Sequence, residues 1–249
     1  MDFIMDLRNQ TAIVTGAGQG MGRGIAEKLS QYGAAVVVSG RTESKVLETA
    51  QIIKSRGGKA LALKADISII SDIRMMFDAC EERFGAPDIF VANAGLSFSS
   101  NLLETTEEEF YKVYDINAKG TYFCLQEAGL RVKDGGRIVL ISSSTTKYPK
   151  KGMSLYSSTK AAISMMAAIA AQELADRKIT VNAVLPGLTE TPFMKTGLPD
   201  EFKRMVADNT PSKRLGNTED VAEAVAFLCS KESHWVNGQQ ILADGGCLC

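Results

Sequence analysis

Seven short apolar runs alternate with longer helix-length segments along this chain of 249 residues. The runs lie at residues 11–15, 34–39, 60–64, 89–92, 137–141, 180–185 and 239–243, and the helical segments include 22–32, 43–56, 71–84, 107–131, 156–176 and 218–229. The runs are almost wholly apolar, as strands covered on both faces require. Strand–helix alternation favours right-handed crossovers between parallel strands. We therefore predict an α/β fold, a doubly wound Rossmann-type domain whose seven-stranded parallel sheet carries helices on both faces.

No linker or low-complexity segment divides the chain, so we expect one domain over residues 1–249. One stretch breaks the regular rhythm, because four of the six prolines fall between residues 186 and 211. We expect at most one short helix there, near residues 200–208. A long irregular excursion in a compact domain is usually functional or mobile. We interpret residues 187–216 as a substrate lid, with a decorative insertion as the alternative. Thr42 and Thr106 are candidate helix caps.

Charge and composition exclude several classes of function. The 28 basic and 29 acidic residues give a net charge of −1, which disfavours nucleic-acid binding. No apolar run reaches the roughly 18 residues that a membrane span needs, and the N-terminus does not resemble a signal peptide. The odd number of cysteines does not suggest a disulfide framework, so we expect a cytoplasmic protein. Cys247 and Cys249 are read as part of a mobile tail rather than a metal site, and His234 is the only histidine.

A glycine-rich turn follows the first predicted strand and leads into a helix. Its glycines stand as Gly16-x-x-x-Gly20-x-Gly22, which departs from the strict Gly-x-Gly-x-x-Gly spacing. Glycines let the backbone approach a pyrophosphate, and the free N–H groups and dipole of a helix N-terminus attract it. We interpret the segment as a dinucleotide-binding turn, the alternative being a glycine-rich turn without a ligand.

The end of the second predicted strand indicates which dinucleotide. An acid about 20 residues after the turn would bond the ribose hydroxyls of NAD, but Gly40 stands there between Ser39 and Arg41. No carboxylate repels a phosphate at that point, and a guanidinium can bind one. We therefore expect NADP(H) to be preferred, with NAD(H) possible. Arg41 as an ordinary surface charge is the alternative.

Tyr156 and Lys160 stand four residues apart on a predicted helix and so share one face. The segment follows a strand that ends in Ser142-Ser143-Ser144, at the sheet edge where ligands bind in parallel sheets. Reduction of a carbonyl needs a proton donor, and a phenol can serve. We expect the nearby ammonium to lower the pKa of Tyr156. A serine hydroxyl can hold the carbonyl oxygen against the phenol.

Taken together, these motifs resemble the short-chain dehydrogenase/reductase family over essentially the whole chain. Its Thr-Gly-x-x-x-Gly-x-Gly appears at residues 15–22, its Asn-Asn-Ala-Gly at 92–95 with Ala92 in place of the first Asn, and its final Ala-Asp-Gly-Gly at 243–246. Ala92 puts the structural role of that asparagine in doubt. The family's tyrosine–lysine pair matches Tyr156 and Lys160, and its serine, 13 residues before the tyrosine, matches Ser143.

The resemblance also assigns further residues. It implies that Asn117 supports a water relay to the lysine, that Asp66 contacts adenine and that Thr191 contacts nicotinamide; a loop-capping role is the alternative for the last two. The expected catalytic residues are Asn117, Ser143, Tyr156 and Lys160. The expected cofactor-binding residues are Gly16, Gln19, Gly20, Met21, Gly22, Ser39, Arg41, Thr42, Asp66, Ile67, Asn93, Ala94, Gly95, Tyr156, Lys160, Pro186, Gly187, Thr189 and Thr191.

We expect an NADPH-dependent oxidoreductase that reduces a ketone or other carbonyl to a secondary alcohol, reversibly. Within the family it resembles 3-oxoacyl-carrier-protein reductases and polyhydroxy-aromatic ketone reductases. The alternatives are an NAD-dependent alcohol dehydrogenase of the same fold and a non-catalytic NADP-sensing module. Lys147, Lys150 and Lys151 would steer an anionic substrate or acidic carrier, or else form a solvated loop. The resemblance implies a homotetramer built on the helices at 107–131 and 156–176, whose small residues allow close packing; no metal, nucleic acid or membrane is expected.

Overall fold

A parallel seven-stranded sheet forms the centre of the computed structural model, which describes residues 5–192 and 199–247. The spatial order is β3-β2-β1-β4-β5-β6-β7. The strands are β1 (Thr11–Val14), β2 (Ala35–Gly40), β3 (Ala60–Lys64), β4 (Ile89–Ala92), β5 (Arg137–Ile141), β6 (Thr180–Pro186) and β7 (Gln240–Ala243). The predicted doubly wound fold is therefore confirmed. The order reverses between β1 and β4, which is the switch point where ligands bind in such sheets.

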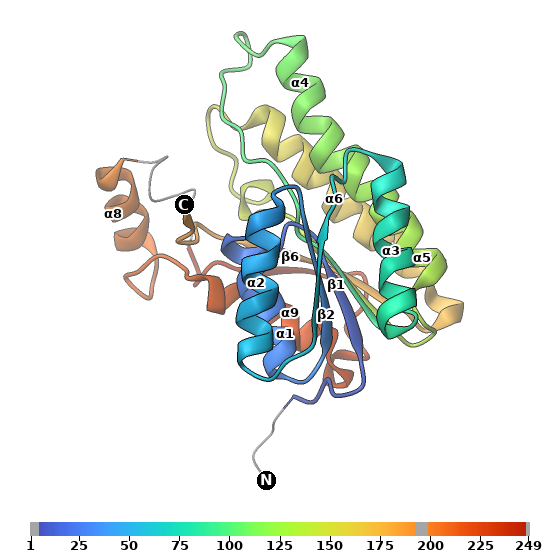
Figure 1. Cartoon of the computed structure of the whole chain (residues 1–249). Helices are drawn as coiled ribbons and strands as arrows, with labels where there is room; N and C mark the ends of the chain where they lie inside the picture. Colours follow the sequence, from blue (N-terminus) through green and yellow to red (C-terminus); the bar gives the residue numbers. More distant parts are fainter. Residues whose placement is uncertain (1–4, 193–198, 248–249) are drawn as a thin grey trace.

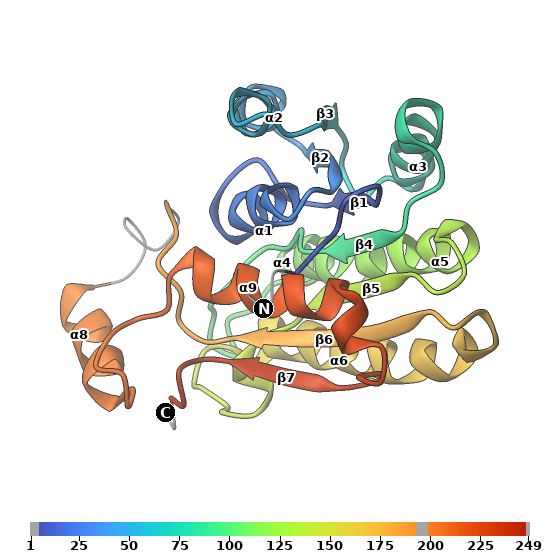
Figure 2. The ribbon, with the colours of Figure 1, turned by 90° about the horizontal axis from the view of Figure 1, so that it is seen from below.

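Helices cover both faces of the sheet (Figure 2). One face carries α1 (Gly20–Gln31), α2 (Glu43–Ser55) and α9 (Thr218–Cys229), and the other carries α3 (Ile70–Phe84), α5 (Thr121–Arg131) and α6 (Ser154–Glu173). Successive strand residues belong to opposite cores: Val14 and Val38 pack in one, and Ile13 and Val37 in the other. This explains why the strands are apolar at consecutive positions.

The helix predicted over residues 107–131 is interrupted. It consists of α4 (Glu107–Tyr114), a π-helical segment (Asp115–Gly120) and then α5. The predicted helical segment thus has the expected bounds, but its central part is π-helical, which the sequence did not indicate. Gly120 lies so close to Ile67 that a Cβ there would be 2.7 Å from the Ile67 carbonyl oxygen, and Asn117 is bonded to neighbouring elements. A π-bulge of this kind is frequent at functional sites.

The excursion after β6 is closed at its base. Thr189 and Gly216 form a parallel bridge, and the Glu190 amide donates a 2.7 Å hydrogen bond to the Gly216 carbonyl oxygen. One helix, α8 (Asp200–Asn209), stands within the described part of the excursion, close to the predicted position. In Figure 1, α4 and α8 lie toward the end of the molecule opposite the N-terminus. Residues 193–198 of the predicted lid lie outside the described residues.

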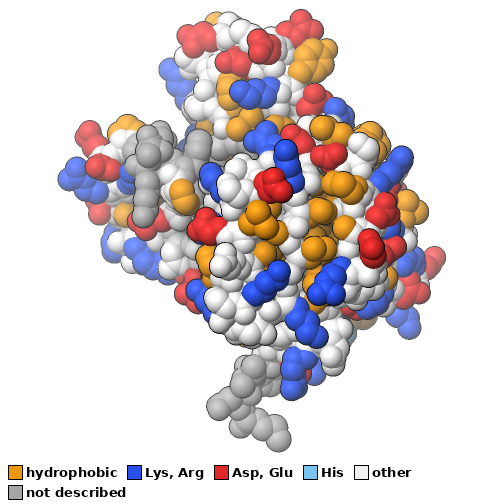
Figure 3. Space-filling model, in the orientation of Figure 1, with side chains coloured by type: hydrophobic (Ala, Val, Ile, Leu, Met, Phe, Trp, Pro, Cys, Tyr) orange, Lys and Arg blue, Asp and Glu red, His pale blue; other side chains and the backbone are white. Residues whose placement is uncertain are grey.

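Two smaller expectations differ in outcome. Thr106 forms a capping box with Glu109, as predicted, whereas Thr42 precedes α2 without a side-chain capping bond and instead lines the cleft described below. Cys247 is buried, and Cys249 lies outside the described residues. No helix in the described ranges is long and apolar enough to cross a membrane, and these ranges contain no metal-binding group of three acidic, histidine or cysteine side chains. On the face in Figure 3, side chains of both charges are interspersed.

Candidate active site

The glycine-rich turn between β1 and α1 is held by the chain that follows β4. Gly16 has a positive φ of 65°, and a Cβ on Gly22 would lie only 2.3 Å from the Gly16 carbonyl oxygen. The Asn93 side-chain amide donates to the carbonyl oxygens of Thr15 and Gly16, at 2.9 and 3.3 Å. The Thr15 hydroxyl accepts from the amides of Asn93 and Ala94, both at 3.0 Å. Asn93 therefore fixes the turn, although Ala92 replaces the family's preceding asparagine.

The turn opens onto a cleft at the carboxyl ends of β1, β2 and β4. The expected cofactor residues that line this cleft are Gly16, Gln19, Gly20, Met21, Gly22, Ser39, Arg41, Thr42, Asp66, Ile67, Asn93, Ala94, Gly95 and Thr191. Five expected cofactor residues do not line it: Tyr156 and Lys160, which are described below, and Pro186, Gly187 and Thr189. Pro186 and Thr189 are buried, the Thr189 hydroxyl bonds the Gly187 carbonyl oxygen at 3.0 Å, and a Cβ on Gly187 would meet Asp244 at 2.7 Å.

Seven lining residues were not predicted: Gly18, Gly40, Lys45, Val46, Ala65, Ile116 and Pro192. Most are small or apolar and carry no chemical signal of their own. Lys45 is the exception, since it adds a cation one helical turn beyond Arg41.

The residues of the cleft fit a dinucleotide. The Gly16–Gly22 approach leaves no room for side chains between the backbone and a pyrophosphate, and α1 begins in the cleft with an N-cap, Gln19, whose side chain makes no capping bond. The first N–H groups of α1 and its dipole thus face the cleft uncapped. The buried Ser39 hydroxyl, at the end of β2, has no hydrogen-bond partner among the described residues. A ligand hydroxyl or phosphate would satisfy it.

Near the end of β2, the cleft is lined by both basic and acidic side chains, which differ in their bonding. Arg41 and Thr42 are exposed, and Asp66 is the only acidic side chain in the lining. Oδ1 of Asp66 accepts hydrogen bonds from the amide and hydroxyl of Ser68, at 2.9 and 2.8 Å, and its own amide donates to Asp72. Asp66 therefore acts as a loop cap at the same time as it lines the cleft.

Ser143, Tyr156 and Lys160 come together beside this cleft. Ser143 follows β5 and begins a short 3₁₀ turn, where its hydroxyl accepts from the Thr145 amide and hydroxyl at 3.2 and 3.0 Å. Tyr156 and Lys160 lie on α6, and the Lys160 Nζ lies 5.8 Å from the centroid of the Tyr156 ring. A Cβ on Gly95 would be 3.3 Å from Nζ, so Lys160 reaches the lining of the cofactor cleft. The structure thus joins the expected catalytic set to the expected cofactor site.

Of the three consecutive serines, Ser142 has a different neighbourhood. Its buried hydroxyl donates to the Lys160 carbonyl oxygen at 2.8 Å and bonds the Ser164 hydroxyl at 2.8 Å. The Lys160 side chain in turn donates to the carbonyl oxygen of Ile141 at 2.8 Å. Both the main chain and the amine of Lys160 are therefore tied to the end of β5.

Asn117 is fully buried in the π-helical segment. Its Oδ1 accepts from the Leu96 amide at 2.7 Å, and its Nδ2 donates to the Leu96 carbonyl oxygen and to the Thr159 hydroxyl at 2.9 and 3.1 Å. The side chain thus joins the loop after β4 to α6, one residue from Lys160. Its expected part in a water relay remains a prediction.

Burial controls the titration of both candidate catalytic groups. Burial raises the pKa of Tyr156, and hydrogen bonding to Ser143 acts in the opposite direction. The pKa is therefore raised, contrary to the lowering expected from Lys160, because desolvation of the phenolate outweighs the hydrogen bond with Ser143. Burial also lowers the pKa of Lys160 from 10.5 to about 8, since the charged amine is disfavoured away from water.

Comparison with known proteins places the chain in a family. The family model described as "Enoyl-(Acyl carrier protein) reductase" matches residues 16–247. The chain is 39% identical to the short chain dehydrogenase/reductase AacuN of Aspergillus aculeatus, over 96% of each chain. It is also 39% identical to a short-chain type dehydrogenase/reductase of Picea abies, over 96% of this chain and 93% of the relative. The chain belongs to the short-chain dehydrogenase/reductase family and is an NAD(P)-dependent oxidoreductase.

Solved structures agree with this assignment. A 7α-hydroxysteroid dehydrogenase complexed with NADH and 7-oxo glycochenodeoxycholic acid superposes with a TM-score of 0.94 and 31% identity, covering 98% of this chain and 96% of that one. The angucycline C-6 ketoreductase LanV, bound to NADP, superposes with a TM-score of 0.92 and 34% identity, covering 98% and 97%. The first of these structures holds NADH and the second NADP, so members of this fold with similar identity to the chain bind either dinucleotide.

Proposed function

We propose that this protein is an NADPH-dependent reductase that converts a ketone to a secondary alcohol. The convergence of Ser143, Tyr156 and Lys160 beside the glycine-lined cleft carries the proposal. When bound, the reduced nicotinamide supplies a hydride to the carbonyl carbon. Every other step falls to the chain.

In this proposal Tyr156 donates its phenolic proton to the carbonyl oxygen. Its raised pKa keeps the phenol protonated at neutral pH, which suits the reductive direction. The Ser143 hydroxyl, positioned by Thr145, holds the carbonyl oxygen against the phenol. The Lys160 ammonium stabilises the phenolate left after proton transfer, and Asn117 keeps the loop after β4 against α6 so that Lys160 retains its position.

Replacement of Tyr156 by phenylalanine tests this assignment. Because general acid catalysis contributes roughly 100-fold to 10,000-fold, Tyr156→Phe should lower kcat for carbonyl reduction by at least about 100-fold while NADPH binding stays near that of the wild type. Tyr111→Phe, a change at an exposed tyrosine on α4, is the matched control and should retain full activity. Full turnover by Tyr156→Phe across a panel of ketones would reject the mechanism.

The preference for NADP is the finer part of the proposal. It is supported by the absence of an acid at the end of β2, by the partnerless Ser39 hydroxyl and by Arg41 in the cleft. The rival is an NAD-dependent alcohol dehydrogenase, favoured by the NADH-bound neighbour. Arg41→Ala should weaken NADPH binding about tenfold and leave NADH binding unchanged. An unchanged preference between the two would remove Arg41 from the assignment.

A non-catalytic sensor is the rival from another class. Its cleft would need the cofactor residues but not Ser143, Tyr156 and Lys160. In this chain Tyr156 is hydrogen-bonded to Ser143, and the Lys160 amine lies 5.8 Å from the centre of the Tyr156 ring. A sensor would bind NADPH and oxidise it with no carbonyl tested, so a ketone panel with purified protein separates the two.

For the substrate we propose a bulky, largely apolar ketone. Beside the start of α6, a cleft is walled by apolar side chains of the loops after β4 and β5, among them Leu102, Leu103 and Met153, with Lys150 and Lys151 at its rim. The Ser100 amide joins the two loops by donating to the Gly152 carbonyl oxygen at 2.9 Å. One similar structure holds 7-oxo glycochenodeoxycholic acid, and another is an angucycline C-6 ketoreductase. Faster reduction of a small aliphatic ketone than of fused-ring ketones would contradict this.

Assembly, lid and compartment complete the proposal. An exposed apolar groove runs between α5 and α6, with Tyr122, Leu130, Met165 and Ile169 among its residues, and we propose that it forms a homotetramer interface.

We propose that the excursion at 187–216 covers the substrate. The position of α8 supports this, since the Lys150 amine lies 5.6 Å from the centre of the Phe202 ring on that helix. The buried thiols of Cys80, Cys124 and Cys229 suit the reducing cytoplasm.

A further inference from the structure

Lys45 lies in the cofactor cleft without an obvious structural task. It belongs to the first turn of α2 and lines the cleft together with Ser39, Arg41 and Thr42. Its Cβ lies against the glycine-rich turn, because a Cβ on Gly18 would be 2.9 Å from it. The lysine therefore rises directly beside the turn that receives the dinucleotide.

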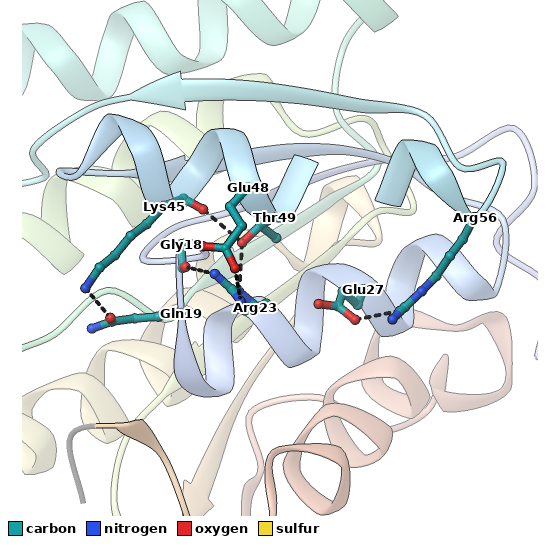
Figure 4. Close-up of polar contacts among 8 residues, drawn as sticks. All are labelled: Gly18, Gln19, Arg23, Glu27, Lys45, Glu48, Thr49 and Arg56. Carbon is teal, nitrogen blue, oxygen red and sulfur yellow. Dashed lines mark hydrogen bonds and ion pairs between the residues drawn. The ribbon is translucent and has the colours of Figure 1, made fainter. Parts of the chain in front are cut away.

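Two other cations drawn in Figure 4, Arg23 and Arg56, are paired with carboxylates, whereas Lys45 forms no ion pair with the described residues. Arg23 bonds the Glu48 carboxylate, the Thr49 hydroxyl and the Gly18 carbonyl oxygen at 2.9, 3.0 and 2.9 Å, and Arg56 pairs with Glu27. Lys45 precedes Glu48 by three residues on α2, so the two side chains could form an ion pair. The Glu48 carboxylate is bonded to Arg23 instead. The Lys45 amine instead donates to the neutral Gln19 side chain, and within the described residues it has no carboxylate within 4.0 Å.

Arg41 also lacks an ion pair with the described residues. It stands next to the buried Ser39 hydroxyl that lacks a partner among them. Within the described residues, two cations without an ion pair and a buried hydroxyl without a partner thus share one end of the cleft, where Asp66, the acid of the lining, is bonded to Ser68. Like charges gathered without counter-ions suit a polyanionic ligand group.

We propose that Lys45 is a second cation for the 2′-phosphate of NADP, acting beside Arg41 and Ser39. The inference deepens the proposed function and rests on its NADP preference. The flexible lysine stem allows the amine to exchange the neutral amide of Gln19 for a phosphate oxygen, a stronger, charge-assisted partner. Because Arg23 occupies the Glu48 carboxylate, the Lys45 amine is available to a phosphate.

Binding of adenosine fragments tests the proposal without the catalytic reaction. Calorimetry would compare 2′,5′-ADP (adenosine 2′,5′-bisphosphate) with 5′-AMP, which differ only in the 2′-phosphate. Lys45→Gln should weaken binding of 2′,5′-ADP about tenfold and leave binding of 5′-AMP within about twofold. Lys45→Arg should restore most of the loss, and Lys54→Gln, an exposed site in the last turn of the same helix, should behave as the wild type. The Lys45 effect should shrink at high salt, because the site is solvent-exposed.

The outcomes separate this inference from the proposed function. If the wild type favours 2′,5′-ADP but Lys45→Gln binds it unchanged, the role of Lys45 is refuted and the NADP preference stands. An equal loss for both ligands would show that Lys45 acts through Gln19 and the turn, which also overturns the proposal. If the wild type binds both fragments equally, the NADP preference itself fails and this inference with it.

Discussion

The Lys160 amine donates a 2.8 Å hydrogen bond to the carbonyl oxygen of Ile141, the last residue of β5. This bond holds a cation inside the protein, close to the Tyr156 ring and the Gly95 edge of the cofactor cleft. A buried charge retained at such a cost in desolvation is more typical of a functional site than of a stabilising contact.

The first prediction concerns the pH dependence of reduction. Burial lowers the pKa of Lys160 to about 8, so the amine is charged below that pH and loses its proton above it. Because the ammonium stabilises the phenolate formed by proton donation, kcat/KM for ketone reduction should be level from about pH 6 to 7.5 and fall above about pH 8. A profile that stays level to pH 10 would exclude this role for Lys160.

Lys160→Met should separate activity from stability. The pKa of the amine is lower in the folded than in the unfolded state, so between about pH 8 and 10.5 the unfolded chain binds more protons and stability rises with pH. Below pH 8 the buried charge costs about 3 kcal/mol, of which the bond to Ile141 returns about 1 kcal/mol. Lys160→Met should therefore raise the free energy of unfolding by about 2 kcal/mol at pH 7 while abolishing turnover.

Urea unfolding at pH 7 and at pH 10.5 measures this difference, with Lys54→Met as a surface control. Most of the gain should disappear at the higher pH, since the wild-type amine is neutral there in the folded state and half deprotonated in the unfolded state. A variant less stable than the wild type at pH 7 would show that the contacts of Lys160 outweigh its desolvation.

Gly22→Ala tests the turn. Its Cβ would lie 2.3 Å from the Gly16 carbonyl oxygen and 2.4 Å from the Asn93 side-chain nitrogen, both fixed by hydrogen bonds. The turn must shift, which should cost about 1–3 kcal/mol of stability and weaken NADPH binding at least about tenfold. Gly129→Ala, where the nearest atoms are Leu174 methyls at 3.5 Å, should be neutral or slightly stabilising in the same assays. Unimpaired NADPH binding by Gly22→Ala would contradict the close approach.

Met165→Glu tests the proposed assembly. Met165 is 58% exposed in the apolar groove between α5 and α6, so a carboxylate there is tolerated in the monomer but would be buried in a shared interface. We expect a homotetramer for the wild type and smaller species for the variant, by light scattering after gel filtration. A Met205→Glu change on exposed α8 should leave the mass unchanged. A monomeric wild type would refute the interface.

The fold was predictable because its signals are local and repeated. Most strands are apolar runs bounded by polar or glycine residues, and the predicted ends lie within one residue of the observed strands. The π-helical segment at Asn117 was missed because its cause is tertiary: close contact of Gly120 with Ile67 and the bonds of Asn117 to Leu96 and Thr159. The periodicity of apolar residues in the sequence does not predict such tertiary contacts.

The site was predictable to the extent that its residues lie on regular elements. The spacing of Tyr156 and Lys160 places both on α6, and the glycines needed at 16 and 22 follow directly from β1. The direction of the Tyr156 pKa was wrong, because burial depends on packing that the sequence does not specify. Lys45 was overlooked because a lysine on an exposed helix usually means only solvation. Its importance arises from Glu48 being held by Arg23.

The central claim is that Tyr156 protonates a carbonyl whose carbon receives hydride in the same cleft. Its most direct test is reduction of a responsive ketone by NADPH carrying deuterium at the transferable position, with wild type and Tyr156→Phe compared at equal cofactor saturation. We predict deuterium at the carbinol carbon of the wild-type product, and bound but unconsumed NADPH in the variant. Deuterated alcohol formed at the wild-type rate by Tyr156→Phe would contradict the account.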